Sequence, residues 1–362
     1  MRYLNLTKYL NESIDRLFRR ALRSSLTNPR EMGFLIGALK IKRRAAKKRL
    51  LSAGDGGGIP PFMIASITTQ CNLRCKGCYD RANRACANPD PKGELGAERW
   101  GAIFSEAEGL GISFILLAGG EPLKRPEVLE RAAETRGVIF PVFTNGTLLS
   151  GDILGLFGRS RNLIPVVSVE GDKHQTDSRR GAGVFDMTRR AMREMKRRGI
   201  FFGCSVTVNK SNMDTVLGDD YVALLRSSGS RLVIYVEYVP VDGEDGLAPG
   251  EGERLAAARR LEELRLRFKD MILISFPGDE QELGGCLAAG RGFFHVNAFG
   301  GAEPCPFSPY SDTSLAEGSI LRALDSDLFT KIRESGLGSQ GHTGGCALFE
   351  RRDAVMSLLA GG

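Results

Sequence analysis

The sequence predicts an α/β protein built around a parallel sheet. Between about residues 62 and 275, six short apolar runs alternate with segments of helical periodicity, and the runs are apolar along nearly their whole length. Strands that are apolar on both faces are typical of a parallel sheet covered by helices, and successive strand–helix units specify crossover connections. The sheet is therefore either doubly wound or curled into a full or partial barrel.

The expected elements alternate along the chain. Strands are expected at 62–67, 114–118, 138–144, 163–169, 201–208 and 232–239. Helices are expected at 97–110, 126–135, 151–157, 185–198, 215–227 and 251–268. The remainder, from about residue 277, is rich in loops, with one helical segment near 324–334 and a hairpin around the turn Phe299-Gly300-Gly301.

The formal net charge of +7 is concentrated at the start of the chain. Residues 1–52 carry 14 Lys and Arg against 3 Asp and Glu, a net charge of +11, and their pattern predicts amphipathic helices with Ile14, Phe18 and Leu22 on one face. The other residues carry 36 basic and 40 acidic side chains, a net charge of −4. We therefore expect three domains: a basic helical extension with a glycine-rich linker (1–58), a core (59–276) and a small C-terminal domain (277–362).

The basic extension has three interpretations. It covers one side of the core, docks on an anionic membrane surface, or captures an acidic partner or leader peptide. The slightly acidic body lacks the basic stripe of a nucleic-acid binder, so no nucleic-acid partner is expected. No secretory signal or apolar run long enough to span a bilayer is visible. We expect a cytoplasmic protein, with the extension as the part that would touch a membrane.

The strongest chemical signal is a group of three cysteines directly after the first expected strand. Cys71, Cys75 and Cys78 are spaced C-x₃-C-x₂-C, and the chain has only eight cysteines, too few for a disulfide scaffold of this length. Three thiolates within eight residues can bind three irons of a [4Fe–4S] cluster, which leaves the fourth iron with an open coordination position. A structural zinc site is the alternative, although zinc ligands more often repeat C-x₂-C at a distance.

This region, over roughly residues 62–240, resembles the radical S-adenosylmethionine (SAM) superfamily. The signature C-x₃-C-x₂-C of that family follows the first strand of a partial (β/α)₆ TIM-like barrel, and Gly119-Gly120-Glu121-Pro122 after the second strand matches its GGEP motif. The resemblance implies such a barrel here, a [4Fe–4S] cluster on the three cysteines, and SAM bound at its open iron. The chain departs from the family at Gly77, where many members carry an aromatic residue.

Polar residues at the ends of the expected strands complete the implied SAM site, because this end of an α/β barrel forms its active-site face. Glu121 would pair with the methionine amino group, Glu170 would contact ribose or methionine, and either of two arginines would neutralise the carboxylate. Each of these side chains could instead cap a turn. The SAM-binding residues implied by the resemblance are Tyr79, Gly119, Gly120, Glu121, Pro122, Asn145, Ser168, Glu170, Arg179, Arg180 and Asn209.

The C-terminal cysteines form a second group. Cys286, Gly300 and Cys305 fit the C-x₉₋₁₅-G-x₄-C pattern of the SPASM and twitch extensions that follow some radical SAM barrels, and Cys346 supplies a later ligand. Three cysteines imply a twitch-type or truncated SPASM domain with one auxiliary [4Fe–4S] cluster. Its fourth iron would bind substrate, or a further ligand such as His342 or Cys86 would complete it. Three buried free thiols are the alternative.

Two further side chains of interest lie inside expected strands. Cys204 lies in an apolar run and is expected to be a packed thiol. Glu237 is the candidate catalytic residue, as a substrate ligand or a proton acceptor, because a carboxylate in an apolar strand is costly unless it is paired.

These features together predict a radical SAM enzyme, an oxidoreductase or a maturase that forms C–C or C–S bonds. It would take an electron from a ferredoxin or flavodoxin type donor, cleave SAM to a 5′-deoxyadenosyl radical, and abstract hydrogen from an unidentified peptide, protein, lipid or small metabolite. The auxiliary cluster would bind substrate or relay an electron. The alternative from another class is a non-enzymatic, zinc-stabilised protein that binds nucleic acid or a partner.

Overall fold

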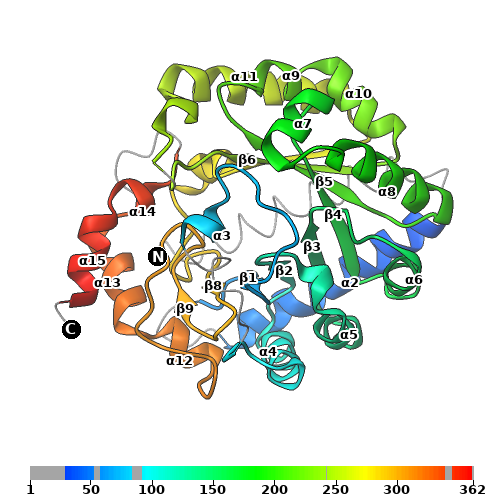
Figure 1. Ribbon diagram of the computed structural model, residues 1–362. Coiled ribbons are helices and arrows are strands. Elements are labelled where there is room, and N and C mark those ends of the chain that lie inside the picture. Colours follow the sequence, from blue (N-terminus) through cyan, green and yellow to red (C-terminus); the bar gives the residue numbers. More distant parts are fainter. Residues whose placement is uncertain (1–28, 53–57, 84–91, 242, 339–344, 361–362) are drawn as a thin grey trace.

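Seven parallel strands form a curled sheet in which each strand pairs with its neighbours in chain order. The computed structural model describes residues 29–52, 58–83, 92–241, 243–338 and 345–360. A doubly wound sheet reverses its strand order, whereas a barrel keeps it sequential. The sheet is a half-barrel, and the predicted partial TIM-like barrel is confirmed (Figure 1). Its strands are β1 (Phe62–Ser66), β2 (Phe114–Ala118), β3 (Phe140–Thr144), β4 (Leu163–Val169), β5 (Gly203–Val208), β6 (Leu232–Glu237) and β7 (Ile272–Phe276).

The strand β7 was not among the six predicted strands. Its apolar run is five residues long and comes soon after a long helix. Periodicity cannot distinguish such a run from the end of a buried helix. It pairs in parallel with β6 along its whole length and so adds one strand to the barrel.

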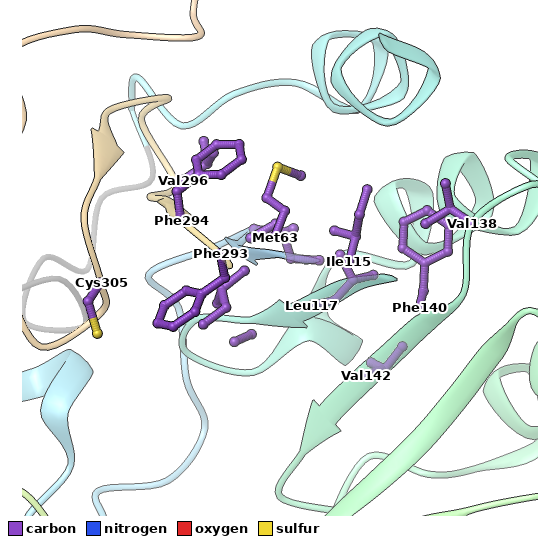
Figure 2. Packing of buried hydrophobic residues seen from close by; sticks show 14 of the residues in the cluster. Met63, Ile115, Leu117, Val138, Phe140, Val142, Phe293, Phe294, Val296 and Cys305 are labelled. Carbon is purple, nitrogen blue, oxygen red and sulfur yellow. The ribbon is translucent and has the colours of Figure 1, made fainter. Parts of the chain in front are cut away.

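Helices cover the outer face of the sheet (Figure 1). The outward side chains Met63, Ile115 and Phe140 are fully buried there, and the Phe140 ring meets the Phe104 ring edge to face with their centroids 5.1 Å apart. Figure 2 shows this packed layer. The covering helices are α4 (Ala97–Leu110), α5 (Pro126–Glu134), α6 (Gly151–Arg159), α8 (Val184–Arg198), α10 (Asp219–Ser227) and α11 (Glu251–Arg267).

Two short helices were not expected as separate elements. The predicted helix at 215–227 begins earlier, as α9 (Met213–Val216), and is then interrupted before α10. The helix α7 (Lys173–Arg180) has almost no apolar residues, so hydrophobic periodicity could not reveal it. A capping box starts α7, because Asp172 accepts from the Gln175 backbone N–H while the Gln175 side chain accepts from the Asp172 N–H.

The helix α2 (Pro29–Ser52) closes the end of the half-barrel at which the strands begin. Leu35, 1% exposed, and Ala38 pack in one cluster with Ile139 and Ile164. At its far end, Lys48 Nζ donates to the carbonyl of Glu108 at 2.8 Å. For residues 29–52, the extension therefore covers the core, the first of its three interpretations. The predicted face of Ile14, Phe18 and Leu22 lies outside the described residues.

The C-terminal region continues the barrel sheet. The predicted hairpin is confirmed as β8 (His295–Val296) and β9 (Ala302–Glu303), which pair antiparallel. The strand β8 also pairs in parallel with β1, which the sequence did not indicate. The predicted helix near 324–334 divides into α12 (Ile320–Leu324) and α13 (Asp327–Ser335), and α14 (Ala347–Glu350) and α15 (Arg352–Ala360) follow.

A buried chain of polar side chains joins this hairpin to the barrel. The His295 ring contacts Ser66 Oγ on β1 through Nε2 at 2.8 Å and Glu303 Oε2 through Nδ1 at 2.7 Å. Asn297 Nδ2 donates to the other Glu303 oxygen at 2.6 Å. A buried polar network is stable only while each member keeps its partners.

We expect Glu303→Ala to lower the free energy of unfolding by about 3 kcal/mol, because it leaves buried His295 and Asn297 groups unpaired. Urea unfolding followed by circular dichroism measures the change. The matched control is Glu317→Ala at an exposed position, where a change within about 0.5 kcal/mol is expected. Equal effects in the two variants would contradict a stabilising role for the chain.

Candidate active site

A cavity of about 540 Å³ lies inside the half-barrel and reaches the cysteine loop. Its lining includes most of the site residues that the sequence predicted, which come from the ends of separate strands. The predicted site residues on its lining are Cys71, Cys75, Cys78, Tyr79, Gly119, Gly120, Asn145, Ser168, Arg179, Arg180 and Glu237. Glu121, Pro122, Glu170 and Asn209 are buried and lie outside that lining.

The cysteine loop is held at both ends by hydrogen bonds. At its start, the Thr69 N–H and Oγ1 both donate to Glu94 Oε1 at 2.7 Å, and Arg125 pairs with the same carboxylate at 3.0 Å. Further along, the Lys76 N–H donates to the Arg179 carbonyl at the end of α7 at 2.9 Å. The loop therefore presents its three thiols from a fixed backbone.

The thiols are half-buried, and burial raises the pKa of Cys71 to about 11 and also raises the pKa of Cys78. Without metal, the Cys71 and Cys78 thiols would be protonated at neutral pH. Iron binding replaces these protons, because metals bind the thiolate form of cysteine.

The Gly-Gly-Glu-Pro segment lies against the start of the cysteine loop. The Gly120 N–H donates to the Thr68 carbonyl and the Glu121 N–H to the Gln70 carbonyl, both at 2.8 Å. A Cβ on Gly120 would lie 2.2 Å from the Gln70 oxygen, and one on Gly119, where φ is +116°, would lie 2.3 Å from the Thr68 oxygen. Only glycine allows this approach of two backbones.

Glu121 is fully buried, and both of its oxygens have partners. Oε1 accepts from Thr144 Oγ1 at 2.8 Å and from the Leu123 N–H at 3.1 Å, and Oε2 accepts from the Asn145 N–H at 2.7 Å. Burial raises the pKa of this carboxyl, and the three donors oppose that shift. The side chain ties the ends of β2 and β3 together, while its contact with the SAM amino group stays a prediction.

Two arginines converge on one buried carboxylate beside the cavity. Arg179 and Arg180 both pair with Glu170 Oε1, and Arg180 Nε donates to it at 2.8 Å. The other oxygen, Oε2, is buried and has no hydrogen-bond partner in the described part of the chain. Two cations against one anion leave a net positive charge, and the orphaned oxygen leaves one acceptor free. A ligand with a carboxylate, such as SAM, fits the two arginines, which line the cavity.

Of the other predicted polar residues, Ser168 and Asn145 line the cavity and Asn209 caps a turn. Ser168 Oγ on β4 lies 3.0 Å from Ser205 Oγ on β5. The Asn145 side-chain amide donates to Asn72 of the cysteine loop at 2.8 Å. The Asn209 side-chain oxygen accepts from the Ser211 N–H and hydroxyl at 2.8 and 2.6 Å, as in a turn cap.

An aromatic ring from elsewhere in the chain lies beside Gly77, the position at which many members of the family carry an aromatic residue. Gly77 has a φ of +64°, and a Cβ there would lie 2.5 Å from Cε2 of Tyr238, which directly follows β6. The Tyr238 ring also lines the cavity. An aromatic ring thus occupies the space beside Gly77 from another strand, a contact that neither local sequence reveals.

Glu237 lines the cavity and is paired. Arg254 Nε of α11 donates to its Oε1 at 2.8 Å, so the cost of placing a carboxylate in an apolar strand is partly offset. Burial nevertheless raises its pKa, and Arg254 opposes this. By contrast, Cys204 is fully buried with its thiol against Met192, and its pKa is raised by burial to about 12, as expected for a packed thiol.

The C-terminal cysteines come together in a second buried site. The Cys305 thiol donates to Cys346, which lowers the pKa of Cys346, whereas burial raises that of Cys286. Figure 2 shows Cys305 to one side of the labelled side chains of the packed layer. His342 and Cys86, the candidate fourth ligands, lie outside the described residues.

The two cysteine sites are neighbours. The ring of Tyr79, next to Cys78, meets the ring of Phe307, two residues after Cys305, with centroids 5.3 Å apart. In the helix α3 (Tyr79–Ala82) and its C-cap, Asn83 Nδ2 donates to the Pro306 carbonyl at 2.8 Å. The loops that carry the two groups are therefore in direct contact.

One buried acidic residue next to this second site was not predicted from the sequence. Glu280 lies in the 3₁₀ helix η4 (Gly278–Leu283) and lines the cavity. Burial raises its pKa to about 8. Its segment, Gly-Asp-Glu-Gln-Glu, looks like an ordinary exposed acidic loop, so the sequence carries no signal for it.

Among the described residues, no three His, Cys, Asp or Glu side chains are close enough to hold a single metal ion. The cysteines of a [4Fe–4S] cluster each bind a different iron and need not converge on one point. In the described part of the chain, no helix is both long and apolar enough to cross a bilayer.

A half-barrel with a C-x₃-C-x₂-C loop at the carboxyl ends of its strands defines the class, and comparison with known proteins agrees. The profile of the Radical SAM superfamily matches residues 65–219, from within β1 to the start of α10. These residues form a radical SAM domain, and the chain is an enzyme, so the zinc-stabilised, non-enzymatic alternative is set aside. A radical SAM domain implies SAM and a [4Fe–4S] cluster.

The chain is also similar to two curated proteins and to one solved structure. The AdoMet-dependent heme synthase of Methanosarcina barkeri is 26% identical over 304 residues, covering 76% of this chain and 85% of its own. The mycofactocin maturase MftC of Mycolicibacterium smegmatis is 26% identical over 328 residues, covering 83% and 79%. The structure of Streptococcus suis SuiB bound to the precursor peptide SuiA has a TM-score of 0.64 at 17% identity, covering 85% and 73%, and shows the shared fold.

We expect Gly77→Ala to reduce iron incorporation at the cysteine loop. The added methyl group meets the Tyr238 ring and forces a side chain into the left-handed region, which costs about 1 kcal/mol before the clash is counted. Iron per chain after anaerobic reconstitution is the measurement. The control is Gly96→Ala, where a Cβ meets nothing within 4 Å. Full iron content in the Gly77 variant would show that the loop tolerates the change.

Proposed function

We propose that the half-barrel binds SAM at its cysteine-lined end and, at its other end, a substrate with a large apolar part from which hydrogen is abstracted. The observation that carries this proposal is a single cavity whose two ends differ in chemistry. One end holds the three thiols and the charged side chains, and the other is lined by aliphatic and aromatic side chains down to α2.

At the SAM end, the residues fit the cofactors that the family implies. Cys71, Cys75 and Cys78 would bind three irons, and the Arg179 and Arg180 pair, held by Glu170, would receive the SAM carboxylate. When bound, the cluster supplies the electron, delivered by a ferredoxin or flavodoxin type donor, that cleaves SAM to a 5′-deoxyadenosyl radical. The barrel orients the reactants and excludes water.

At the other end, the inner face of the sheet is apolar. Its side chains Leu116, Phe143 and Ile274 keep part of their surface exposed inside the barrel, which is unfavourable unless something covers them. Side chains fill this space in most α/β barrels. The apolar side chains that line this end are Leu35, Phe114, Leu116, Ile139, Phe143, Ile164, Phe201, Leu232, Ile234, Ile272 and Ile274.

This lining favours some substrate classes over others. The charged groups on the described lining are Arg179, Arg180, Glu237, Asp279 and Glu280, and the apolar end has none. A small polar metabolite would leave that end uncovered. An acyl or isoprenoid chain, a large ring system or an apolar peptide segment would fill it, and heme synthase and maturase relatives are compatible with such substrates.

We also propose an auxiliary [4Fe–4S] cluster on Cys286, Cys305 and Cys346. Three thiols in one buried site support it, and the contact of Tyr79 with Phe307 supports a position next to the first cluster. When bound, this cluster can accept an electron from a substrate radical. Glu237 is our candidate to take up the accompanying proton, because its carboxylate faces the cavity.

We expect Cys71→Ala, Cys75→Ala and Cys78→Ala, singly or together, to abolish reductive SAM cleavage, since each removes one anchor of the cluster. Chromatographic quantification of 5′-deoxyadenosine after dithionite reduction checks this. Cys204→Ala, which removes a packed thiol outside both sites, is the control and should retain cleavage. Formation of 5′-deoxyadenosine by the triple variant would refute the assignment.

We expect an organic-solvent extract of the source cells to stimulate 5′-deoxyadenosine formation more than an aqueous low-mass extract does. Ile234→Glu places a charge in the apolar end and should reduce that stimulation at least tenfold. The reason is that an apolar substrate bound there would bury the charge without a partner, which is unfavourable. Stimulation by the aqueous fraction alone, undiminished in the variant, would overturn the apolar-substrate proposal.

A further inference from the structure

The carboxylate of Glu280 is buried beside the C-terminal cysteines and has one oxygen without a partner. The residue is 4% exposed, on the segment that leads from β7 to Cys286. The Leu287 N–H donates to the carboxylate, but Oε1 has no hydrogen-bond partner in the described part of the chain. Buried polar atoms without partners are rare and call for an unseen ligand or a specific role.

The surroundings of this carboxylate contain thiols but no described ion pair. It interacts electrostatically with the thiols of both Cys346 and Cys286. The nearby Arg291 guanidinium is directed to the carbonyls of Cys286, at 2.5 Å, and Gly284, at 3.4 Å. Asp279, the adjacent acid, is held elsewhere, because both of its oxygens accept from Arg265 at 2.7 to 2.9 Å.

We propose that Glu280 is the fourth ligand of the auxiliary cluster, binding through Oε1 the iron that Cys286, Cys305 and Cys346 leave open. This inference rests on the proposed auxiliary cluster. Iron accepts carboxylate oxygen as a ligand. An iron cation would also provide a counter-charge in direct contact, because Arg291 acts on the carboxylate electrostatically without a described ion pair. Ligation would use the one oxygen that has no hydrogen-bond partner in the described part of the chain.

Ligation by Glu280 bears on what the auxiliary cluster does. A cluster with four protein ligands has no open iron for substrate, so of the two roles considered, only electron relay remains. Glu280 also lines the cavity, at its charged end, which places this edge of the cluster against the space that SAM and substrate would share. The carboxylate would therefore stand between the reacting substrate and the acceptor of its electron.

The test uses a chain that carries the auxiliary cluster alone. The full-length Cys71→Ala/Cys75→Ala/Cys78→Ala variant, reconstituted anaerobically, should hold about four irons. Its reduced EPR spectrum should be unchanged by cyanide, a small probe that binds open iron sites. Adding Glu280→Ala should create a cyanide-dependent shift of the signal and, on mild oxidation, the signal of a cluster that has lost one iron. Glu280→Cys should restore four irons and remove the cyanide effect.

Two further variants control for misfolding and for a general effect of charge. Glu280→Gln keeps the side-chain shape and an acceptor for the Leu287 N–H, so it should show the cyanide effect even if Glu280→Ala folds poorly. Glu350→Gln removes a charge that also acts on Cys346, but from an exposed position, and should match the parent.

The outcomes separate the two proposals. If the parent triple variant binds no iron, both the auxiliary cluster and its fourth ligand are wrong. If it binds about four irons and the Glu280→Gln and Glu280→Cys spectra equal the parent's with and without cyanide, the cluster stands and ligation by Glu280 is wrong.

Discussion

The site depends on a close contact between two backbones. The segment after β2 can hydrogen-bond to the start of the cysteine loop only because Gly119 and Gly120 have no side chains to strike the carbonyls of Thr68 and Gln70. Pairing of β1 with β2 brings these segments together, and Glu121 extends the connection to the end of β3. The position of the three thiols is thus set by the strand register rather than by the loop's own sequence.

The cavity has a charged end and an apolar end, at opposite ends of the half-barrel. Charge is confined to the carboxyl ends of the strands, where Arg179 and Arg180 share Glu170, and the opposite end is closed by the apolar side of α2. A polar cofactor and an apolar substrate can therefore occupy one continuous space without competing for the same lining. The C-terminal cysteines adjoin the charged end through the contact of Tyr79 with Phe307.

Elements with a periodic apolar pattern were predictable, and so were motif residues at strand ends. The barrel, most of its helices and the β8–β9 hairpin follow from such patterns. What escaped prediction depends on contacts between distant segments or on elements without an apolar face. The helix α7 is almost wholly polar, Tyr238 fills the space at Gly77 from another strand, and burial alone distinguishes Glu280 from a surface acid.

The parallel pairing of β8 with β1 has a consequence for the integrity of the sheet. Without β8, the backbone groups along one side of β1 would form an exposed edge, and such an edge readily pairs with other chains. The residues after β7 therefore protect the sheet as well as carrying cysteines. A chain ending after β7 would keep the radical SAM motifs yet expose an aggregation-prone strand directly beneath its cysteine loop.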